Sequence, residues 1–249
     1  MKKASEQSML YTLKIIAHIR KNKRNGTSNF YNKTCEWLLQ NNEKQLIVNM
    51  KILLEKYIKV LSEDYKVEYP ELAKTLEDIM SGNVEFDFET ILPQVAVGVK
   101  EASRNSGGKA ITALSKAHVA VMGGSADLTK STKAKGVNGN YDKDNRLSRN
   151  VNYGVREHAM AAMVNGMVLH GLKAFSGAFF VFADYMKPAA RMAAIMNIPS
   201  TFIFSHDSIA VGEDGPTHEP IEQLSMLRTT PNINVFRPAD ANETNYSYR

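Results

Sequence analysis

The residues that decide the fold are Pro199-Ser-Thr-Phe-Ile-Phe-Ser205 and the segment that follows them, His206-Asp-Ser-Ile-Ala-Val-Gly-Glu-Asp-Gly-Pro-Thr-His-Glu-Pro220. β-branched and aromatic side chains fill the first part, which predicts a buried strand. Two glycines and two prolines in the second part exclude a regular element, so a loop is expected to follow the strand.

This loop concentrates groups that can carry chemistry: His206, Asp207, Glu213, Asp214, His218 and Glu219. Ligands of open α/β sheets bind beyond the carboxyl ends of the strands, so the loop is a candidate site. The alternative is a solvated loop whose acidic side chains only cap the next helix.

Helix and strand patterns alternate around this stretch from residue 95 onward. Strands are predicted at 119–124, 173–180, 200–204 and 233–237, and helices at 95–114, 157–170, 183–196, 220–227 and from Asp240 or Asn242. Residues 129–150 are polar without an apolar period, which predicts a long loop. The alternation predicts an α/β fold in which a parallel sheet has helices on both faces.

Residues 1–92 carry helical patterns and no catalytic constellation. One helix is predicted at 71–80, after Pro70 and before Gly82. We therefore expect a helical extension or linker over 1–92 and an α/β domain over 93–249. The last helix has barely begun at Arg249, so that domain is expected to be incomplete at its C-terminus.

Composition indicates a globular protein. Of its 249 residues, 43% are hydrophobic, which is enough for a sizeable core. The single cysteine, Cys35, excludes an internal disulfide and favours a reducing, cytoplasmic location. No apolar run reaches the length of about 18 residues that spans a bilayer, and no secretory signal is recognisable. No membrane partner is expected.

The net charge of +5 is unevenly distributed. Residues 1–34 contain eight Lys and Arg against Glu6 alone, a net of +7, so the remaining residues carry −2. A body without positive excess excludes a basic nucleic-acid-binding domain. The cluster Arg20-Lys-Asn-Lys-Arg24 is either a solvated arm or a patch for localisation or polyanion binding.

Glu157 lies in Asn152-Tyr-Gly-Val-Arg-Glu-His158, at the start of the helix predicted for 157–170. A carboxylate at that position complements the helix dipole, which is one sufficient explanation for it. The functional alternative is proton exchange with a bound heterocycle, which requires Glu157 to be buried at an interface.

Phe179, Phe182 and Tyr185 recur every three residues. Aromatic residues at this spacing form either a core or a platform on which a planar ring stacks. Gly177 and Ala178 precede them and permit close approach of a ligand.

The sequence offers no metal or nucleotide-phosphate motif. His206 and His218 are 12 residues apart across a flexible loop, unlike paired imidazoles on one helix face. Hydrogen bonds to hydroxyls or phosphate suit them better. Gly123-Gly124 is either a tight turn or a turn that a ligand approaches closely.

Five segments together resemble the transketolase family, specifically its central pyrimidine-binding domain. They follow the family order at near-family spacing over about residues 93–245: Gly123-Gly-Ser-Ala-Asp-Leu-Thr129, Asn152 to His158, Gly177-Ala-Phe-Phe-Val-Phe-Ala-Asp-Tyr185, His206 to His218, and Phe236-Arg-Pro-Ala-Asp240. Residues 65–82 also resemble the helical segment that precedes this domain. The resemblance implies the thiamine-diphosphate-binding fold and transfer of a two-carbon ketol unit between sugar phosphates, with thiamine diphosphate and a divalent cation.

The resemblance also implies cofactor contacts. Glu157 corresponds to the catalytic carboxyl group that hydrogen-bonds the aminopyrimidine ring of the cofactor. Phe182 corresponds to the residue that stacks on that ring, and Phe179 and Tyr185 shape the same pocket.

Substrate contacts are implied in the same way. Arg104, Ser131 and His206 fall where the family binds the sugar phosphate, although Asn105-Ser-Gly-Gly-Lys109 departs from the usual context of the arginine. Asp214 corresponds to a residue that recognises a substrate hydroxyl. His218 corresponds to a catalytic residue at the reacting end of the donor.

No counterpart is found for the family's first domain, which holds the diphosphate and Mg²⁺ or Ca²⁺. Because family sites form between subunits, the resemblance implies at most half a site. We expect a fragment or one half of a split enzyme, working in a homo- or hetero-oligomer with a diphosphate-binding domain or subunit. The alternatives are a non-catalytic remnant or interaction subunit, and a related enzyme such as dihydroxyacetone synthase.

Overall fold

A computed structural model describes residues 62–96 and 98–249. The chain divides into two compact units, Met1–Lys74 and Thr75–Arg249. The helical patterns noted before residue 62 lie outside the described residues. The expected boundary between residues 92 and 93 stays a prediction.

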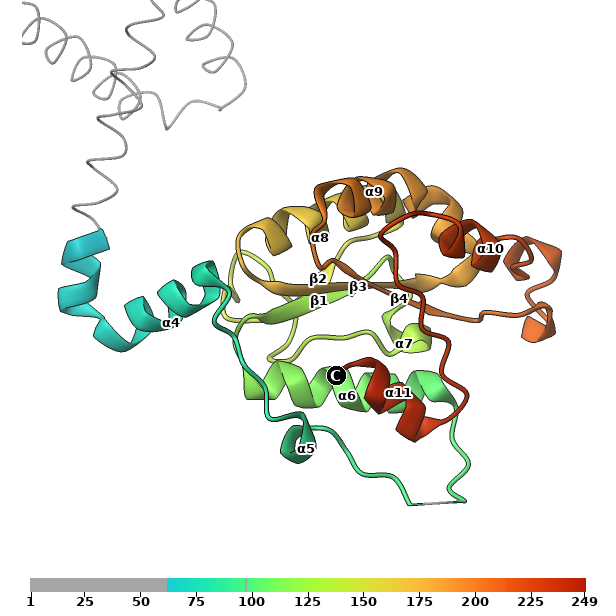
Figure 1. Ribbon diagram of the computed structural model, residues 1–249, viewed down its shortest axis with the longest axis horizontal. Coiled ribbons are helices and arrows are strands. Elements are labelled where there is room, and N and C mark those ends of the chain that lie inside the picture. The colour runs from blue at the N-terminus through green and yellow to red at the C-terminus, as the bar shows by residue number, and fades with distance from the viewer. Residues whose placement is uncertain (1–61, 97) are drawn as a thin grey trace, which may run out of the picture. The chain divides into compact units, whose positions relative to one another are not determined.

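The second unit is built on a four-stranded sheet in the order β2-β1-β3-β4, in which every pair is parallel (Figure 1). The strands are β1 (Val121–Ser125), β2 (Asn150–Asn152), β3 (Lys173–Phe179) and β4 (Thr201–Ser205). In the register, Ser125 is opposite Gly177 and Phe179 is opposite Ser205. The carboxyl ends of these three strands therefore lie at one edge of the sheet.

Helices cover both faces, so the predicted α/β architecture is confirmed. In Figure 1, α8, α9 and α10 lie on one side of the sheet and α6 and α11 on the other. Their bounds are α6 (Ser103–Ala117), α8 (Glu157–Leu169), α9 (Ala183–Met196), α10 (Gln223–Arg228) and α11 (Ala241–Ser247). Short turns η1 (Phe180–Phe182), η2 (Ile209–Val211) and η3 (Pro216–His218) lie near the carboxyl ends of β3 and β4.

Apolar packing explains how each helix layer is fixed to the sheet. On one face, Ile111 and Leu114 of α6 join Val121 and Phe175 in a buried cluster. On the other face, the cores contain residues of α8, α9 and β3, namely Met160, Ala161, Val164, Ala174, Ala178, Met186 and Ala189. Small alanines and flexible methionines allow α8 and α9 to pack closely on the sheet.

Several expected elements differ in extent. Residues 95, 96 and 98–102 are not helical: α6 begins at Ser103, and Gly98 has φ +89°, which a right-handed helix excludes. The long loop at 129–150 contains the short helix α7 (Thr129–Thr132) and ends in β2. The helix expected from residue 220 begins at Gln223.

The strand predicted at 233–237 is wrong. This segment is extended but belongs to no sheet within the described residues. The reason is that a strand requires a hydrogen-bonded neighbour, and β4 pairs only with β3 in the described part of the chain.

The segment before the sheet contains α4 (Pro70–Ser81) and α5 (Phe88–Ile91). The helix predicted at 71–80 is therefore confirmed, with Pro70 as its first residue and Gly82 in the left-handed region directly after it. Ile79 packs with Val84 and Ala120 of the second unit's core. No described helix is long and apolar enough to cross a membrane.

Candidate functional site

His206 occupies the point where β4 ends and the polar loop begins. It has φ +57°, a left-handed conformation that few residues other than glycine adopt. The backbone therefore turns sharply after the buried Ser205. This turn brings the imidazole to within 3.8 Å of the Phe179 ring, measured between centroids.

Two hydrogen bonds fix the tautomer of His206. Its Nε2 lies 3.2 Å from a guanidinium nitrogen of Arg104, and its Nδ1 lies 2.9 Å from Ser205 Oγ. Arg104 can only donate, so Nε2 accepts and carries no proton. The proton of the neutral ring therefore sits on Nδ1 and is donated to Ser205.

The surroundings keep this imidazole neutral. Burial lowers the pKa of His206 from its ordinary value, and the positive charge of Arg104 lowers it further. Asp214 and Asp207 act in the opposite direction, and His218 adds to the lowering. His206 is thus a neutral ring beside an exposed guanidinium, a pair that suits a phosphate group.

An aromatic group lies next to this pair, at the end of β3. The rings of Phe179 and Phe182 are nearly parallel, at 7°, with centroids 6.1 Å apart. Tyr185 is on the first turn of α9, and its ring centroid lies 6.2 Å from that of Phe182. The side chain of Tyr185 is exposed. Half-buried Phe182 and exposed Tyr185 leave ring surface accessible to a planar ligand.

His218 contacts both phenylalanine rings. Its ring meets Phe182 edge to face, at 74° and a centroid distance of 5.4 Å. Its Nδ1 is 2.9 Å from Thr217 Oγ1. The structure thus brings His206, His218, Phe179 and Phe182 together, although the two histidines are separated by a loop.

Glu157 is the first residue of α8 and is buried, with 8% of its surface exposed. In the described part of the chain, no side-chain hydrogen bond involves the carboxyl group of Glu157. Phe182 packs on the cluster that contains Met160, one turn after Glu157. Glu157 therefore begins the helix whose next residues form the core on which Phe182 packs.

Ser131 and Asp214 are less closely tied to these residues. Ser131 lies on α7, which contacts β3 and β4, but no described hydrogen bond joins its hydroxyl to Arg104 or His206. Asp214 is exposed in the loop and acts on His206 only through its charge. Their predicted substrate contacts stay predictions.

Sequence reasoning missed Ser205 and Arg237. Ser205 orients His206, and Arg237 forms an ion pair of 2.7 Å with Asp207 in the next position of the loop. The only available signal for Ser205 was its position at the end of a strand. The contact of Arg237 depends on two segments 30 residues apart, and no local pattern indicates it.

Metal binding finds no support in this part of the chain. Among residues 62–96 and 98–249, no three His, Cys, Asp or Glu side chains gather in a way that could hold a metal ion. The expectation that a cation is held by another domain stays a prediction.

Comparison with protein families gives one match, described as "Transketolase, pyrimidine binding domain", over residues 100–249. A transketolase of Geobacillus stearothermophilus is 52% identical over 188 residues, which are 74% of this chain and 28% of that protein. A transketolase of Bacillus subtilis is 50% identical over 182 residues, 72% of this chain and 27% of that protein. The chain therefore spans about 28% of the length of these curated relatives.

Solved structures agree with these matches. The transketolase of Pichia stipitis in complex with sedoheptulose-7-phosphate has a TM-score of 0.74 and 35% identity, covering 82% of this chain and 31% of that one. The transketolase of Campylobacter jejuni has a TM-score of 0.67 and 41% identity, with 81% and 30% covered.

Proposed function

The chain belongs to the transketolase family, and we propose that its second unit supplies the pyrimidine-binding half of a thiamine-diphosphate site for ketol transfer between sugar phosphates. The observation that carries this proposal is the stacked pair Phe179 and Phe182, placed beside the Arg104–His206 pair. One side of this arrangement suits a flat heterocycle, and the other suits a phosphate.

The residues present fit the pyrimidine ring of the cofactor. Phe182 offers a half-buried ring face between Phe179 and Tyr185, and stacking is the geometry that planar rings favour. The buried Glu157 has no described partner, so its carboxyl group is free to bond a ring nitrogen. When bound, the cofactor would supply the nucleophilic carbon chemistry of ketol transfer, and the residues of this chain would bind and orient its pyrimidine ring.

Glu157 would then donate or accept the proton at the pyrimidine nitrogen. Phe179, Phe182 and Tyr185 would orient the ring and exclude water from it.

Arg104 would bind the substrate phosphate with a charge-assisted hydrogen bond, and His206 and Ser131 would complete the contact. His218 would move protons at the reacting end of the donor, where its edge-on packing against Phe182 holds it. Asp214 would recognise a substrate hydroxyl from the loop.

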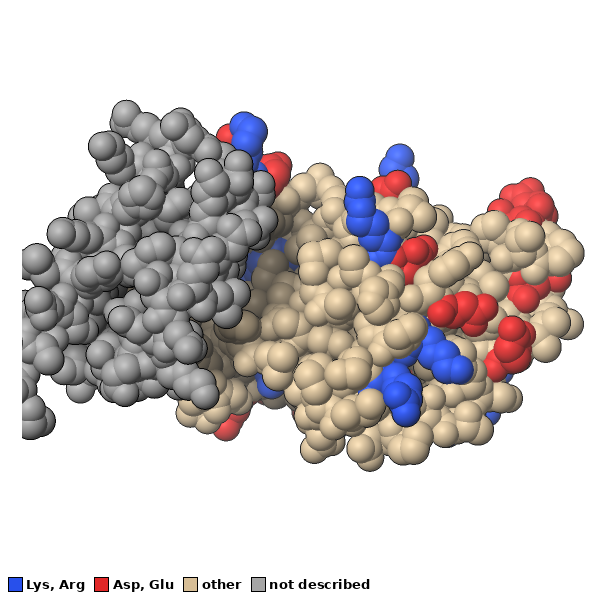
Figure 2. All heavy atoms as spheres, turned by 90° about the horizontal axis from the view of Figure 1, so that it is seen from above, with Lys and Arg blue, Asp and Glu red and all other residues tan. Residues whose placement is uncertain are grey.

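The site needs a second half. We propose that a diphosphate-binding domain or subunit holds the diphosphate and Mg²⁺ or Ca²⁺, and that the chain works in a homo- or hetero-oligomer. One surface favours such assembly: α8 and α9 expose Met163, Leu169, Tyr185, Met192 and Ile195. Figure 2, which views the molecule from this side, shows uncharged surface interrupted by several Lys, Arg, Asp and Glu side chains.

That surface equally supports the second candidate function, a non-catalytic interaction subunit. A transfer assay separates the two functions. Xylulose 5-phosphate and ribose 5-phosphate are incubated with thiamine diphosphate and Mg²⁺, with this chain alone and with a separately made diphosphate-binding half. Transfer only in the mixture supports the half-site. A mixture that forms a stable complex but transfers nothing favours the interaction subunit.

Glu157→Gln in the active mixture gives the matched test of the site. We expect transfer to fall at least about 100-fold, as for loss of a positioned proton-transfer group, with little change in the melting temperature. Glu219→Gln, in the loop, is the control and should retain transfer. If Glu157→Gln lowers stability instead of transfer, the assignment of Glu157 is wrong. A related enzyme such as dihydroxyacetone synthase would keep the cofactor and transfer the two-carbon unit to a different acceptor.

A further inference from the structure

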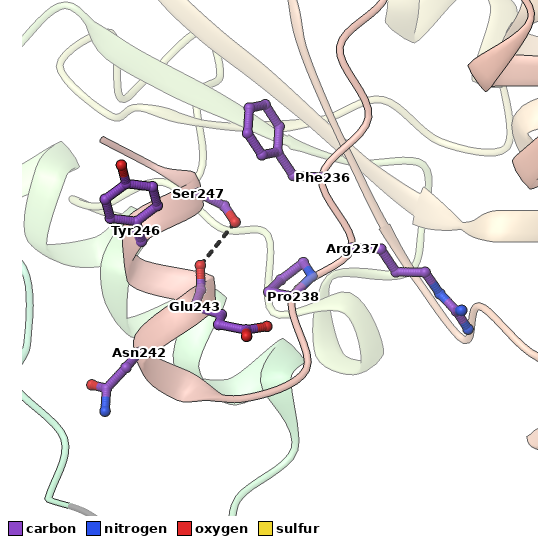
Figure 3. A pocket seen from close by; sticks show the side chains of 7 residues that line it. All are labelled: Phe236, Arg237, Pro238, Asn242, Glu243, Tyr246 and Ser247. Atoms are coloured by element: carbon purple, nitrogen blue, oxygen red, sulfur yellow. Dashed lines mark hydrogen bonds between the residues drawn. The ribbon is translucent and has the colours of Figure 1, made fainter.

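The loop that carries His206 and His218 has few polar attachments to the rest of the chain. Among the described residues, three pairs of side chains join residues 206–223 to other segments by hydrogen bonds: Arg104–His206, Arg237–Asp207 and Asp184–Gln223. The first two hold the beginning of the loop. Figure 3 shows Arg237 extending away from Glu243 and Tyr246 of α11, and its guanidinium group meets Asp207 at 2.7 Å. Only the third pair lies at the end that carries His218.

The middle of the loop cannot fix His218 by itself. Gly212 and Gly215 have φ +89° and +76°, and a Cβ added at either would meet nothing within 4 Å. Glu213 and Asp214, between these glycines, are exposed. The position of His218 therefore depends on the segment that follows it.

Gln223 anchors that following segment. It is the first residue of α10 and is buried, with 2% of its surface exposed. Its Oε1 accepts the backbone N–H of Ile221 at 2.9 Å, and its Nε2 donates to both carboxylate oxygens of Asp184 at 3.1 Å. A backbone N–H only donates and an ionised carboxylate only accepts, so the orientation of the amide is fixed. Both ends of the buried amide are satisfied, which offsets its desolvation.

The two partners of Gln223 belong to the two sides of the candidate site. Ile221 lies three residues after His218, and Asp184 lies two residues after Phe182, on the first turn of α9. One side chain therefore joins the end of the histidine loop to the helix that follows the aromatic group. The His218 ring lies between these attachments and the phenylalanines, 5.4 Å from Phe182 and 6.2 Å from Phe179.

Apolar packing alone would not give this placement. Leu227 of α10 packs with Phe180 and Ala183, which holds α10 against the start of α9. Apolar contact is non-directional, so it does not determine the path of the chain that enters α10. The bonds of Gln223 are directional, and those to Asp184 are strengthened by its charge.

We infer that Gln223 and Asp184 are positioning residues that together hold the His218 imidazole against Phe182. They act through the loop and touch neither substrate nor cofactor. The chemical role of His218 rests on the proposed function, but the placement of its ring by this pair does not. Loss of the pair should move His218 and leave His206, at the other end of the loop, in place.

Gln223→Glu tests the pair with almost no change in shape. At about pH 8, well above the ordinary carboxyl pKa values of about 4, the new carboxylate repels that of Asp184. NMR of the chain alone records the ring protons of His218, assigned with a His218→Asn variant, whose chemical shifts report the neighbouring phenylalanine rings. We expect these shifts to move toward those of an exposed histidine, while those of His206 stay unchanged.

An exchange of the two groups provides the rescue. In Asp184→Asn combined with Gln223→Glu, the new amide donates to the new carboxylate, which still accepts from Ile221. The His218 shifts should therefore return to the original values. Asp184→Ala, at an exposed position, is a second single variant that tests the pair if Gln223→Glu does not fold, and it should move the His218 shifts in the same direction.

Asn165→Asp is the matched control. Asn165 is also a buried amide, 5% exposed, which donates to the carbonyl of Ala189 at 2.9 Å and accepts from Ser200 at 2.8 Å. The change should lower the melting temperature and leave the His218 shifts unchanged. If Gln223→Glu leaves these shifts unchanged, if Asn165→Asp moves them as much, or if the exchange does not restore them, the inference is wrong.

Transfer by the mixture with the diphosphate-binding half adds a kinetic test. Gln223→Glu should lower kcat at least about tenfold and change KM less than about twofold, because a misplaced proton-transfer group weakens the transition state more than substrate binding. A rise in KM with unchanged kcat would contradict the inference. If the unaltered mixture transfers nothing, the proposed function fails, and the NMR measurements still decide the inference.

Discussion

β1 and β4 both have five residues and both pair in parallel with β3, yet their environments differ. β1 lies between β2 and β3, and most of its residues are buried. β4 has one described neighbour, and only Ser205 is buried. The comparison teaches that equal length and equal pairing with β3 do not give equal packing, because packing depends on whether the second edge is filled.

The largest effect is expected inside β1. A Cβ at Gly124 would lie 2.0 Å from the carbonyl oxygen of Val151, and backbone in the middle of a sheet cannot move away. Gly124→Ala should therefore lower the free energy of unfolding by about 3 kcal/mol or more, measured in urea. Gly166→Ala is the control, because nothing lies within 4 Å there and alanine in a helix is favourable by about 0.5–1 kcal/mol. Equal effects of the two changes would contradict the tight packing of β1.

The next effect compares two phenylalanines on the two sides of the sheet. Phe175 of β3, opposite β1, is 4% exposed, and Phe175→Ala should cost about 3–5 kcal/mol of unfolding free energy. Phe204 of β4 is only half-buried, although it contacts Phe180 at 5.2 Å. Phe204→Ala should cost about half as much. If the two costs are equal in urea unfolding, β4 is packed as firmly as its neighbour and the contrast is lost.

A smaller effect concerns the end of β4. Burial and Arg104 lower the pKa of His206 below its ordinary 6.5, so Arg104→Ala should raise it, as measured by NMR titration. As pH falls, the unfolded chain takes up this proton before the folded chain does, so the stability due to neutral His206 is full above about pH 6.5 and declines below it. Arg104→Ala should reduce that decline.

Lys109→Ala is the control for the titration, because it removes the same charge from α6. Lys109 pairs with Glu101 at 2.7 Å and not with His206. If Lys109→Ala shifts the pKa of His206 as much as Arg104→Ala does, the shift reflects overall charge instead of the contact.

The smallest effect is expected at the ion pair between Arg237 and Asp207. Both side chains are close to half exposed, and pairs of this kind contribute about 0.2–1 kcal/mol. Asp207→Asn should change the unfolding free energy by no more than that at low salt, and by less at high salt. A loss well above 1 kcal/mol would mean that this single contact holds the extended segment in place.

Local patterns predicted the elements that satisfy their own hydrogen bonds. The helix expected at 183–196 matches α9, because helical pairing is internal to the segment. Residues 233–237 show the reverse case, since their strand pattern is present but pairing depends on another segment. At 95–102 the apolar spacing was misleading, because Gly98 adopts a positive φ and Val99 is exposed.

The candidate site divides in the same way. The grouping of Phe179 and Phe182 follows from their spacing around the end of β3, which sequence could indicate. The hydrogen bond between Arg104 and His206 joins residues 102 positions apart, so only the folded chain shows it. Nor could the sequence indicate that Ser205 would fix the tautomer of His206.

That fixed tautomer makes anion capture at the end of β4 a proton-linked event. The Nε2 lone pair of His206 is satisfied by Arg104, so an anion that draws the guanidinium away leaves this lone pair without a donor. A neighbouring negative charge favours the protonated imidazole, so the ring takes up a proton from solvent. Phosphate affinity should then weaken as pH rises, and calorimetry in buffers of different ionisation enthalpy should record a fractional proton entering with each anion.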